Sequence, residues 1–322
     1  MQWLFIADPI SSFQIKKDST YAMMQAAQAQ AHEIWVAELG DLYARKDRVY
    51  ASSAPIRLQS LAPGVKALKN PRWYTQGERQ ERYLGEFDAV LMRKDPPFDL
   101  EFLYATLLLE QAARGGARVF NQPQVLRDHN EKLAILEFPE FIADTLVSRD
   151  PQRLRAFVQE HRLAIFKLLD GMGGASIFQA RADDPNLSVI LETMAQFGKR
   201  SVMAQAYIPE IRDGDKRVLL IGGEVVPYAL ARIPKAGEAR GNLAAGGRAE
   251  ARPLSAADKR IGEYLAPRLH ARGLFLVGLD IIGTFLTEIN VTSPTCFREI
   301  MDQTGFDVAK FFVQKLTQAC KP

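Results

Sequence analysis

The chain has 322 residues, 47% of them hydrophobic and 25% charged, which is the profile of a globular protein with two or three domains. Its 41 Lys and Arg against 38 Asp and Glu leave a formal net charge of only +3, which argues against a nucleic-acid-binding protein with a broad basic surface. No apolar run approaches the roughly 20 residues of a membrane helix, and the start lacks a signal peptide's basic and long apolar regions, so we expect a cytoplasmic protein.

Strands and helices alternate along the first 120 residues, without repeats or low-complexity tracts, which indicates an α/β fold. The pattern predicts strands over Trp3–Ala7, Ile34–Ala37 and Ala89–Met92, and helices over Ser19–Ala31 and Leu100–Gly115. The segment Arg45–Arg82 is polar and contains prolines, and its structure cannot be predicted. Asn121-Gln-Pro123 marks a plausible domain boundary.

Two charged loops follow predicted strands of this first unit, at residues 8–20 and 93–99. In an open α/β sheet, ligands bind beyond the carboxyl ends of the strands. The two loops would present cations and helix caps to one crevice, which indicates an anionic small molecule. The alternative is a pair of solvated turns.

A glycine-rich segment follows the predicted strand Ala164–Lys167. Gly171, Gly173 and Gly174 would let backbone N–H groups point into a concave loop that holds phosphate oxygens, and Lys167 would add a charge beside them. The order of residues matches neither a Walker A loop nor a dinucleotide fingerprint. A glycine-rich hairpin turn is the alternative interpretation.

Two further segments suit a nucleotide site. A strand running from Val202 into Pro209 has backbone that could bind an adenine edge, and another strand is predicted at Val218–Ile221. The long loop Arg232–Arg248 is rich in Gly, Ala and Arg. Such a loop could close as a lid over an anionic complex, and a disordered surface linker is the alternative.

Oxygen-bearing side chains interrupt an apolar hairpin near the end of the chain. The strands Leu274–Ile282 and Phe285–Val291 are predicted to meet at a tight turn, Gly283-Thr284. Glu288 and Asn290 leave the same face of their strand, and Asp280 on the partner strand could face them. These hard ligands suit Mg²⁺ shared with substrate phosphates, whereas the alternative is an edge hairpin with a wet face.

Together these features resemble the ATP-grasp ligases, and in particular the bacterial glutathione synthetase family. The resemblance spans nearly the whole chain and rests on five segments: Lys94–Asp99, Leu126–Lys132, Asp170–Phe178, Arg240–Arg248 and Thr287–Thr295. Two departures are visible: Leu168 stands where the family has proline, and Arg45–Arg82 does not resemble the family clearly.

The resemblance implies an ATP-grasp fold: an N-terminal open α/β domain (1–122), a small central α+β domain with the glycine-rich loop (123–200), and a C-terminal α+β domain (201–322) with the metal site and a lid at 233–248. It implies that γ-glutamylcysteine is joined to glycine to give glutathione, with ATP converted to ADP and phosphate through an acyl phosphate. Two Mg²⁺ ions, for which Mn²⁺ could substitute, and a homotetramer are also implied.

Residue roles carry over from the same resemblance. The metal ligands would be Asp280, Glu288 and Asn290, and the catalytic side chains Arg217, Lys167 and Arg232. ATP would be bound by Lys132, Lys167, Gly171, Gly173, Gly174, Ser176, Gln205, Ala206, Tyr207, Ile208, Asp215 and Arg217. The dipeptide and the lid would use Asp18, Ser19, Arg93, Arg232, Arg240, Gly246, Gly247 and Ser293.

Other residues are expected to be structural. Cys296 has no histidine near it in sequence, and an acyl-phosphate route needs no thiol, so a buried packing role is expected. The four histidines show no metal-ligand spacing. Two other functions stay open: an ATP-grasp carboxylate–amine ligase with a different acceptor, and a non-catalytic nucleotide sensor. The sensor is disfavoured because such a protein would tend to lose Arg217 or a metal ligand.

Overall fold

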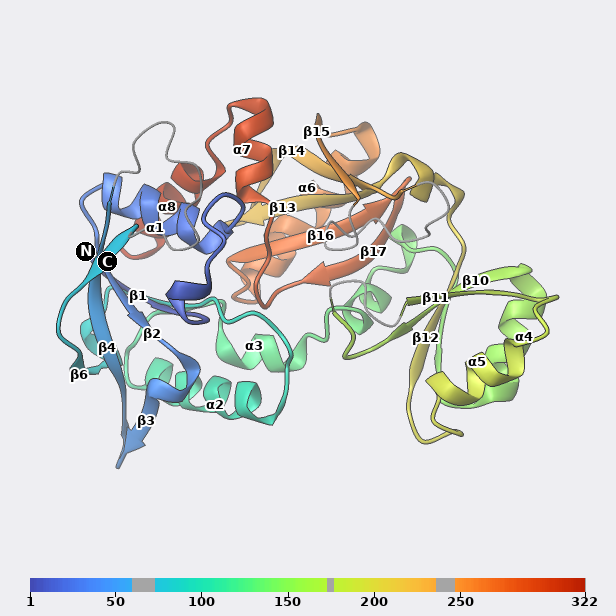
Figure 1. Cartoon of the computed structure of the whole chain (residues 1–322), viewed down its shortest axis with the longest axis horizontal. Coiled ribbons are helices and arrows are strands. Elements are labelled where there is room, and N and C mark those ends of the chain that lie inside the picture. Colours follow the sequence, from blue (N-terminus) through green and yellow to red (C-terminus); the bar gives the residue numbers. More distant parts are fainter. Residues whose placement is uncertain (60–72, 173–176, 236–246, 322) are drawn as a thin grey trace.

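The computed structural model describes residues 1–59, 73–172, 177–235 and 247–321, which form three sheets with flanking helices. In Figure 1 the N-terminal sheet lies at the left, the five-stranded sheet in the middle and the four-stranded sheet at the right. The chain passes from the left sheet to the right sheet, returns to the middle sheet and ends back at the left, where both termini lie together.

The N-terminal sheet has a parallel centre and an antiparallel edge. Strands β2, β1, β7 and β8 run parallel, while β4 pairs antiparallel with β2, β3, β5 and β6. The strands are β1 Gln2–Ile6, β2 Glu33–Ala37, β3 Leu42–Arg45, β4 Arg48–Leu58, β5 Tyr74–Gln76, β6 Gln80–Tyr83, β7 Ala89–Met92 and β8 Val119–Phe120. The predicted strands are confirmed to within a residue, and the unpredicted segment 45–82 supplies the antiparallel edge.

Helices α1 Ser19–Ala29, α2 Leu100–Arg114 and α3 Pro123–Asp128 accompany this sheet. Two of them begin at carboxylate caps: the side chain of Asp18 accepts from the Tyr21 N–H at 2.7 Å, and that of Asp99 accepts from the Phe102 N–H at 2.9 Å. Helix α1 ends two residues earlier than predicted, because its last turn closes onto Gln30.

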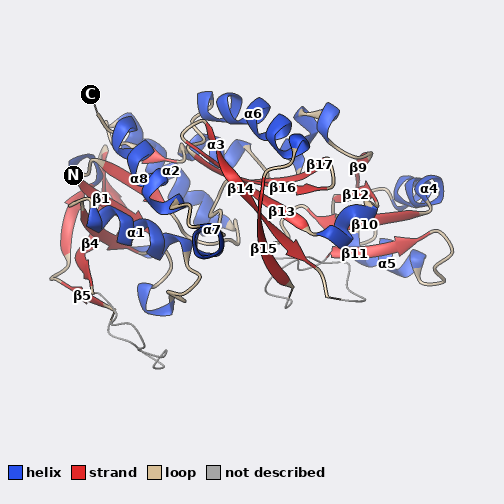
Figure 2. Ribbon diagram, turned by 90° about the horizontal axis from the view of Figure 1, so that it is seen from above, coloured by secondary structure: helices blue, strands red, loops and turns tan. Residues whose placement is uncertain are grey.

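The four-stranded sheet is antiparallel, in the order β11-β10-β12-β9, and carries helices α4 and α5 (Figure 2). Its buried residues, such as Leu154, Phe166 and Leu191, form a small core of their own. The elements are β9 Thr145–Ser148, α4 Pro151–His161, β10 Leu163–Leu168, β11 Ile177–Arg181, α5 Leu187–Met194 and β12 Val202–Ala206.

The five-stranded sheet is antiparallel, in the order β15-β14-β13-β16-β17. Its elements are β13 Asp215–Ile221, β14 Glu224–Ile233, β15 Arg248–Pro253, α6 Ala256–Ala271, β16 Leu276–Ile282, β17 Phe285–Asn290, α7 Phe297–Thr304 and α8 Val308–Ala319. The predicted β16–β17 hairpin is confirmed, with its turn at Gly283, whose φ is +59°.

The predicted loop Arg232–Arg248 is partly strand. Arg232 lies in β14, Arg248 begins β15, and Ile233 pairs with Arg248 across the two strands. The expectation of an irregular segment was therefore wrong at both ends. Its many Gly, Ala and Arg residues give no strand pattern, and the strands form because they pair with each other in the sheet. Residues 236–246 lie outside the described residues.

The N-terminal and five-stranded sheets share continuous hydrophobic cores. Leu4 belongs to the same buried cluster as Val277, and Phe5 to the same cluster as Leu219. The side chain of Asn121 joins the two sheets, since it accepts from the N–H groups of Phe275 and Leu276 and donates to the carbonyl oxygens of Leu276, in β16, and of Val291, just after β17. These two sheets therefore form one packed body to which the four-stranded sheet is attached.

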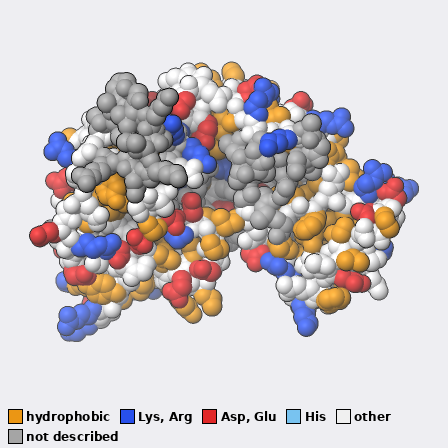
Figure 3. All heavy atoms as spheres, viewed as in Figure 1, with side chains coloured by type: hydrophobic (Ala, Val, Ile, Leu, Met, Phe, Trp, Pro, Cys, Tyr) orange, Lys and Arg blue, Asp and Glu red, His pale blue; other side chains and the backbone are white. Residues whose placement is uncertain are grey.

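The short 3₁₀ turns complete the described chain, at Ile10–Ser12, Leu39–Asp41, Leu84–Glu86, Leu133–Glu137, Pro139–Phe141 and Pro209–Asp213. Within the described ranges, none of the helices combines the length and apolarity that crossing a membrane requires. Acidic and basic side chains are interspersed over the face shown in Figure 3, in agreement with the small net charge.

Candidate active site

A cavity of about 300 Å³ lies between the four-stranded and five-stranded sheets, with a further wall from the N-terminal unit. This is the size of a small-molecule site. Most of the residues predicted for the nucleotide and the metal line it, together with Arg232 and Ser293, which were predicted for the dipeptide: Lys132, Lys167, Gly171, Gln205, Ala206, Tyr207, Ile208, Asp215, Arg217, Arg232, Asp280, Glu288, Asn290 and Ser293.

Two arginines and two aspartates form a network at the floor of the cavity, in which Arg217 and Asp280 are buried and Asp215 and Arg232 half-buried. Arg217 lies opposite Asp280 on β13 and β16, and its guanidinium donates to both carboxylate oxygens, at 2.6 and 3.2 Å. Arg232, opposite Asp215 on β13 and β14, reaches Asp215 Oδ2 at 2.5 Å and Asp280 Oδ2 at 2.9 Å. The sheet register therefore pairs these charges directly.

The two aspartates have opposite pKa shifts. Burial is the largest cause of the raised pKa of Asp215, which is about 6; Arg232 and Arg217 lower this pKa only in part, and the negative charges of Asp280 and Glu288 raise it further. Burial by itself would raise the pKa of Asp280 as well, but the positive charges and hydrogen bonds of Arg217 and Arg232 lower it more and hold the pKa of that carboxyl below its usual range. Asp215 Oδ1 is buried with no hydrogen-bond partner among the described residues. It is thus an acceptor open to a ligand donor.

Two lysines occupy the opposite wall. Lys132 and Lys167 are only 5% and 7% exposed. Lys132 Nζ donates to the Gly171 carbonyl oxygen at 2.6 Å and lies 3.5 Å from Glu288, while Lys167 Nζ lies 3.8 Å from the same carboxylate. One carboxylate does not neutralise two buried ammonium groups, so this wall favours an anion.

An apolar slot lies beside the end of β12. The side chains of Ile165, Ile177, Ile211 and Ile282 line the cavity there together with residues 206–208. Flat apolar walls beside a strand end suit a planar base. Gln205 itself is nearly buried and its side-chain amide donates to Thr145 Oγ1 at 3.3 Å.

The wall from the N-terminal unit is built around Arg93. This buried guanidinium donates to Thr20 Oγ1 at 3.1 Å and to the Pro294 carbonyl oxygen at 3.0 Å. Ser293 Oγ donates to the Arg93 carbonyl oxygen at 3.4 Å and lines the cavity. Arg93 thereby shapes the loop 292–295 from outside the cavity.

The remaining predicted substrate residues are distributed differently. Asp18 caps α1, and burial raises its pKa. The buried Ser19 hydroxyl accepts from the Phe297 N–H at 3.2 Å. Gly247 directly precedes β15 and does not line the cavity among the described residues. Five further predictions, Gly173, Gly174, Ser176, Arg240 and Gly246, lie outside the described residues.

The proposed metal ligands lie close together on the β16–β17 hairpin, where an irregularity in the register between Asp280 and Ile281 brings Glu288 opposite Asp280. Asp280 and Glu288 are register partners on β16 and β17, and Asn290 faces Gly278. Asn290 donates its amide N–H to the Gly278 carbonyl oxygen at 3.1 Å, which leaves its side-chain oxygen to accept. Two carboxylates and an amide oxygen are hard ligands, and they lie beside lysines suited to phosphate, so the residues fit Mg²⁺. Asp280 would share its oxygens between the cation and the arginines.

Sequence reasoning missed several residues of the site. Asp95 and Pro96 line the cavity, and so does Glu131, which lies inside the segment 126–132 that the resemblance used. The hydrogen bonds of Glu131 go to residues 289–292, about 160 positions along the chain. Only the adjacent charged position at Lys132 could have pointed to it.

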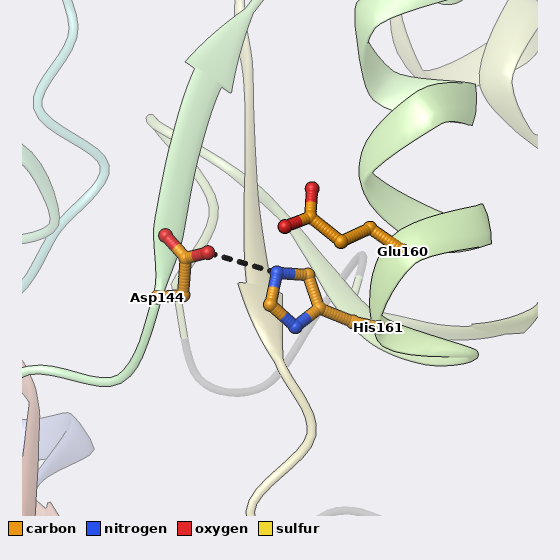
Figure 4. Close-up of side chains that lie close together, drawn as sticks. All are labelled: Asp144, Glu160 and His161. Atoms are coloured by element: carbon orange, nitrogen blue, oxygen red, sulfur yellow. Dashed lines mark hydrogen bonds and ion pairs between the residues drawn. The ribbon is translucent and has the colours of Figure 1, made fainter.

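One group of potential metal ligands lies away from the cavity. Asp144, Glu160 and His161 place one ligand atom each within 4.8 Å of one another (Figure 4). His161 Nε2 lies 2.8 Å from Asp144 Oδ2, and both carboxylates are exposed. This ion pair accounts for the cluster. The fold thus brings His161 to carboxylates that its sequence spacing did not indicate.

Comparison with known proteins agrees with this geometry. Residues 1–127 match the model of the prokaryotic glutathione synthetase N-terminal domain, and residues 131–305 match that of the prokaryotic glutathione synthetase ATP-grasp domain. The glutathione synthetase of Ralstonia nicotianae is 54% identical over 99% of this chain and 96% of its own length. That of Nitrosomonas europaea is 53% identical over 99% and 98%.

Solved structures share the fold at low identity. D-cycloserine synthetase DcsG superimposes with a TM-score of 0.66 at 14% identity over the whole of both chains. The ATP-grasp ligase PsnB, in complex with precursor peptide PsnA2 and AMPPNP, gives 0.63 at 17% over 100% of this chain and 98% of its own. These likenesses identify an ATP-grasp fold, and the full-length matches are more specific: the chain belongs to the prokaryotic glutathione synthetase family.

Proposed function

We propose that this protein joins γ-glutamylcysteine to glycine and thereby makes glutathione, with ATP converted to ADP and phosphate. Membership of the family makes it an ATP-dependent, ADP-forming ligase that uses a divalent metal ion. The observation in the site that best supports the proposal is the convergence of four largely buried cations on one cavity: Lys132, Lys167, Arg217 and Arg232.

The reaction brings several negatively charged groups close together. The lining holds four cations and five carboxylates, Asp95, Glu131, Asp215, Asp280 and Glu288, so its formal charge is 4 − 5 = −1 before any ligand enters, and bound divalent cations would have to offset the charge of the substrates. A substrate carboxylate that attacks a polyphosphate brings like charges together, and fixed cations in a water-poor site stabilise them. The four fixed cations, together with bound divalent metal ions, would let the cavity hold an anionic nucleotide and an anionic acceptor together.

The nucleotide has a defined orientation in this proposal. The adenine would lie in the apolar slot, with the backbone of residues 206–208 along its edge, and Lys132 and Lys167 would hold the phosphates together with the glycine-rich loop 171–176. The unpartnered Oδ1 of Asp215 would accept a hydrogen bond from a ribose hydroxyl. Asp280, Glu288 and Asn290 would hold two Mg²⁺ ions, with Mn²⁺ as a substitute. A bound cation supplies Lewis-acid stabilisation of phosphate charge.

Two bond exchanges follow. The cysteinyl carboxylate oxygen bonds to the γ-phosphorus while the bond to the β–γ bridging oxygen breaks, which releases ADP and leaves an acyl phosphate. The glycine amine then attacks the acyl carbon, phosphate leaves, and the amine gives up a proton. Arg217 and Arg232 would stabilise the charge that develops in both steps, with Lys167 on the transferred phosphoryl group.

The acceptor side is proposed from the predicted residues. Ser293 and Arg232 would contact the dipeptide within the cavity, while Asp18, Ser19 and Arg93 would support the wall behind it. Arg240, Gly246 and Gly247 would belong to a lid over residues 233–248. We also propose that the chain is divided into units 1–122, 123–200 and 201–322, with strand β12 of the third unit hydrogen-bonded into the sheet of the second. A homotetramer is proposed as the oligomeric state.

The test is ADP release by the purified protein with ATP and Mg²⁺, with γ-glutamylcysteine and glycine supplied singly and together, and with the product mass read in parallel. We expect release only when both are present, together with the mass of the tripeptide. Release with another acceptor would identify a different carboxylate–amine ligase. Nucleotide binding without turnover on any acceptor would indicate a sensor.

A further inference from the structure

Glu131 accepts hydrogen bonds from the backbone on both sides of Asn290. Its carbonyl oxygen accepts from the Ile289 N–H at 2.9 Å. Its carboxylate Oε1 accepts from the Val291 N–H at 2.8 Å, the Thr292 N–H at 3.0 Å and Thr292 Oγ1 at 2.9 Å. A single residue thus receives four hydrogen bonds from the segment 289–292.

The position of this segment in the sheet explains the contacts. Strand β17 is the last in the order β15-β14-β13-β16-β17, so one of its edges has no neighbouring strand within the described part of the chain. Backbone N–H groups on an open edge need a partner other than a strand. Glu131 provides it at the point where β17 ends, and thereby fixes the backbone that carries Asn290 and leads into the cavity wall at Thr292 and Ser293.

The residues on either side of Glu131 contact the other wall of the cavity. Asn130 Nδ2 donates to the Leu169 carbonyl oxygen at 3.0 Å. Lys132 Nζ donates to the Gly171 carbonyl oxygen at 2.6 Å and lies 3.5 Å from Glu288 on β17. The segment 130–132 therefore links the chain that follows β10, on the phosphate side, to the Glu288 side chain and to the backbone on both sides of Asn290.

We propose that Glu131 is a positioning residue that couples the phosphate-binding lysine to the metal-binding strand, so that the cavity binds a divalent cation and a nucleotide together. The proposal rests on the proposed function for the role of Glu288 and Asn290 as metal ligands. Partners that orient a metal ligand from behind typically change metal affinity or activity by about 10- to 100-fold when they are removed. Glu131 would act in this way through the backbone of residues 289–292.

The experiment measures nucleotide binding rather than turnover. A non-hydrolysable ATP analogue is titrated calorimetrically into wild type, Glu131→Ala and Glu131→Gln, each with and without Mg²⁺. Mg²⁺ should raise the affinity of the wild type for the nucleotide by a certain factor, and we expect this factor to be roughly 10- to 100-fold smaller in Glu131→Ala. The affinity measured without Mg²⁺ should be nearly unchanged. Glu131→Gln should recover most of the loss, because its amide oxygen can still accept from the same N–H groups. Glu140→Ala, at an exposed turn nearby, is the matched control.

A merely structural role would lower the melting temperature of Glu131→Ala and leave the Mg²⁺-dependent gain as in wild type, and that result would overturn the proposal. If Glu131→Ala does not fold, Thr292→Val takes its place, since it removes one of the hydrogen bonds to the carboxylate. An unchanged Mg²⁺ gain in that variant would also overturn the proposal. A wild type that binds the Mg²⁺ complex but makes no glutathione would refute the proposed acceptors and leave the role of Glu131 intact.

Discussion

Replacement of Arg217 by alanine tests the floor of the cavity most directly. Arg217 is 6% exposed, and its guanidinium donates two hydrogen bonds to Asp280. The variant leaves Asp280 with Arg232 as its remaining guanidinium partner and removes one of the four cations that line the cavity. One proposed source of positive charge for both chemical steps is then lost.

The structure sets the expected size of two separate effects. Loss of one preorganised charge-stabilising donor lowers turnover by ~10²–10³, equivalent to about 3–4 kcal/mol in the barrier. Breaking a buried ion pair costs about 3–5 kcal/mol of stability, and we expect the lower end because Arg232 still reaches Asp280 at 2.9 Å. Arg217→Lys keeps the charge but loses the two-pronged contact, so it should fall between wild type and alanine.

The assay is steady-state ADP release with saturating ATP, γ-glutamylcysteine and glycine, at a temperature well below the melting temperature of every variant. Arg212→Ala, an exposed arginine in the turn before β13, is the control and should match wild type. Arg217→Ala that is folded and turns over at the wild-type rate would refute the reasoning. A fall in turnover that follows the fall in melting temperature would assign Arg217 a structural role only.

Three further predictions concern the same cavity. The pKa of Asp215 is raised from 3.8 to about 6, so the folded state holds its proton more tightly than the unfolded chain, and this contribution to stability is present below pH 3.8 and is lost as pH rises through 6. The free energy of unfolding of Asp215→Asn should therefore rise by up to about 3 kcal/mol relative to that of the wild type between pH 4 and 7. Melting temperatures of the two proteins that change in parallel with pH across that range would contradict the shift. Lys132→Ala should weaken ATP binding by roughly 10- to 100-fold in calorimetry, as expected for one charge-assisted hydrogen bond, whereas exposed Lys199→Ala should not. Deletion of Ala236–Ala245 should leave ATP binding nearly intact and abolish ligation, and a deletion variant that ligates normally would argue against a lid.

Local patterns predicted much of the framework. The strand Ala89–Met92 and the β16–β17 hairpin follow from short apolar runs and a glycine turn. The turn alone would set Asp280 opposite Thr287, and the register irregularity that sets it opposite Glu288 is a property of the folded sheet. The antiparallel edge within residues 45–82 was not predicted. Strands β5 and β6 are short and largely exposed, so their side chains carry little of the alternation that marks a strand.

The amino-acid sequence by itself determined the fold class and the chemical types present at the site, because periodicity, turn residues and the charged positions that end apolar strands are local properties of the chain. Which charges meet was decided by the tertiary structure. Arg217 contacts Asp280 across 63 positions, and Glu131 contacts Val291 across 160. Such pairings depend on strand register and on open sheet edges, which form only when distant segments pack together.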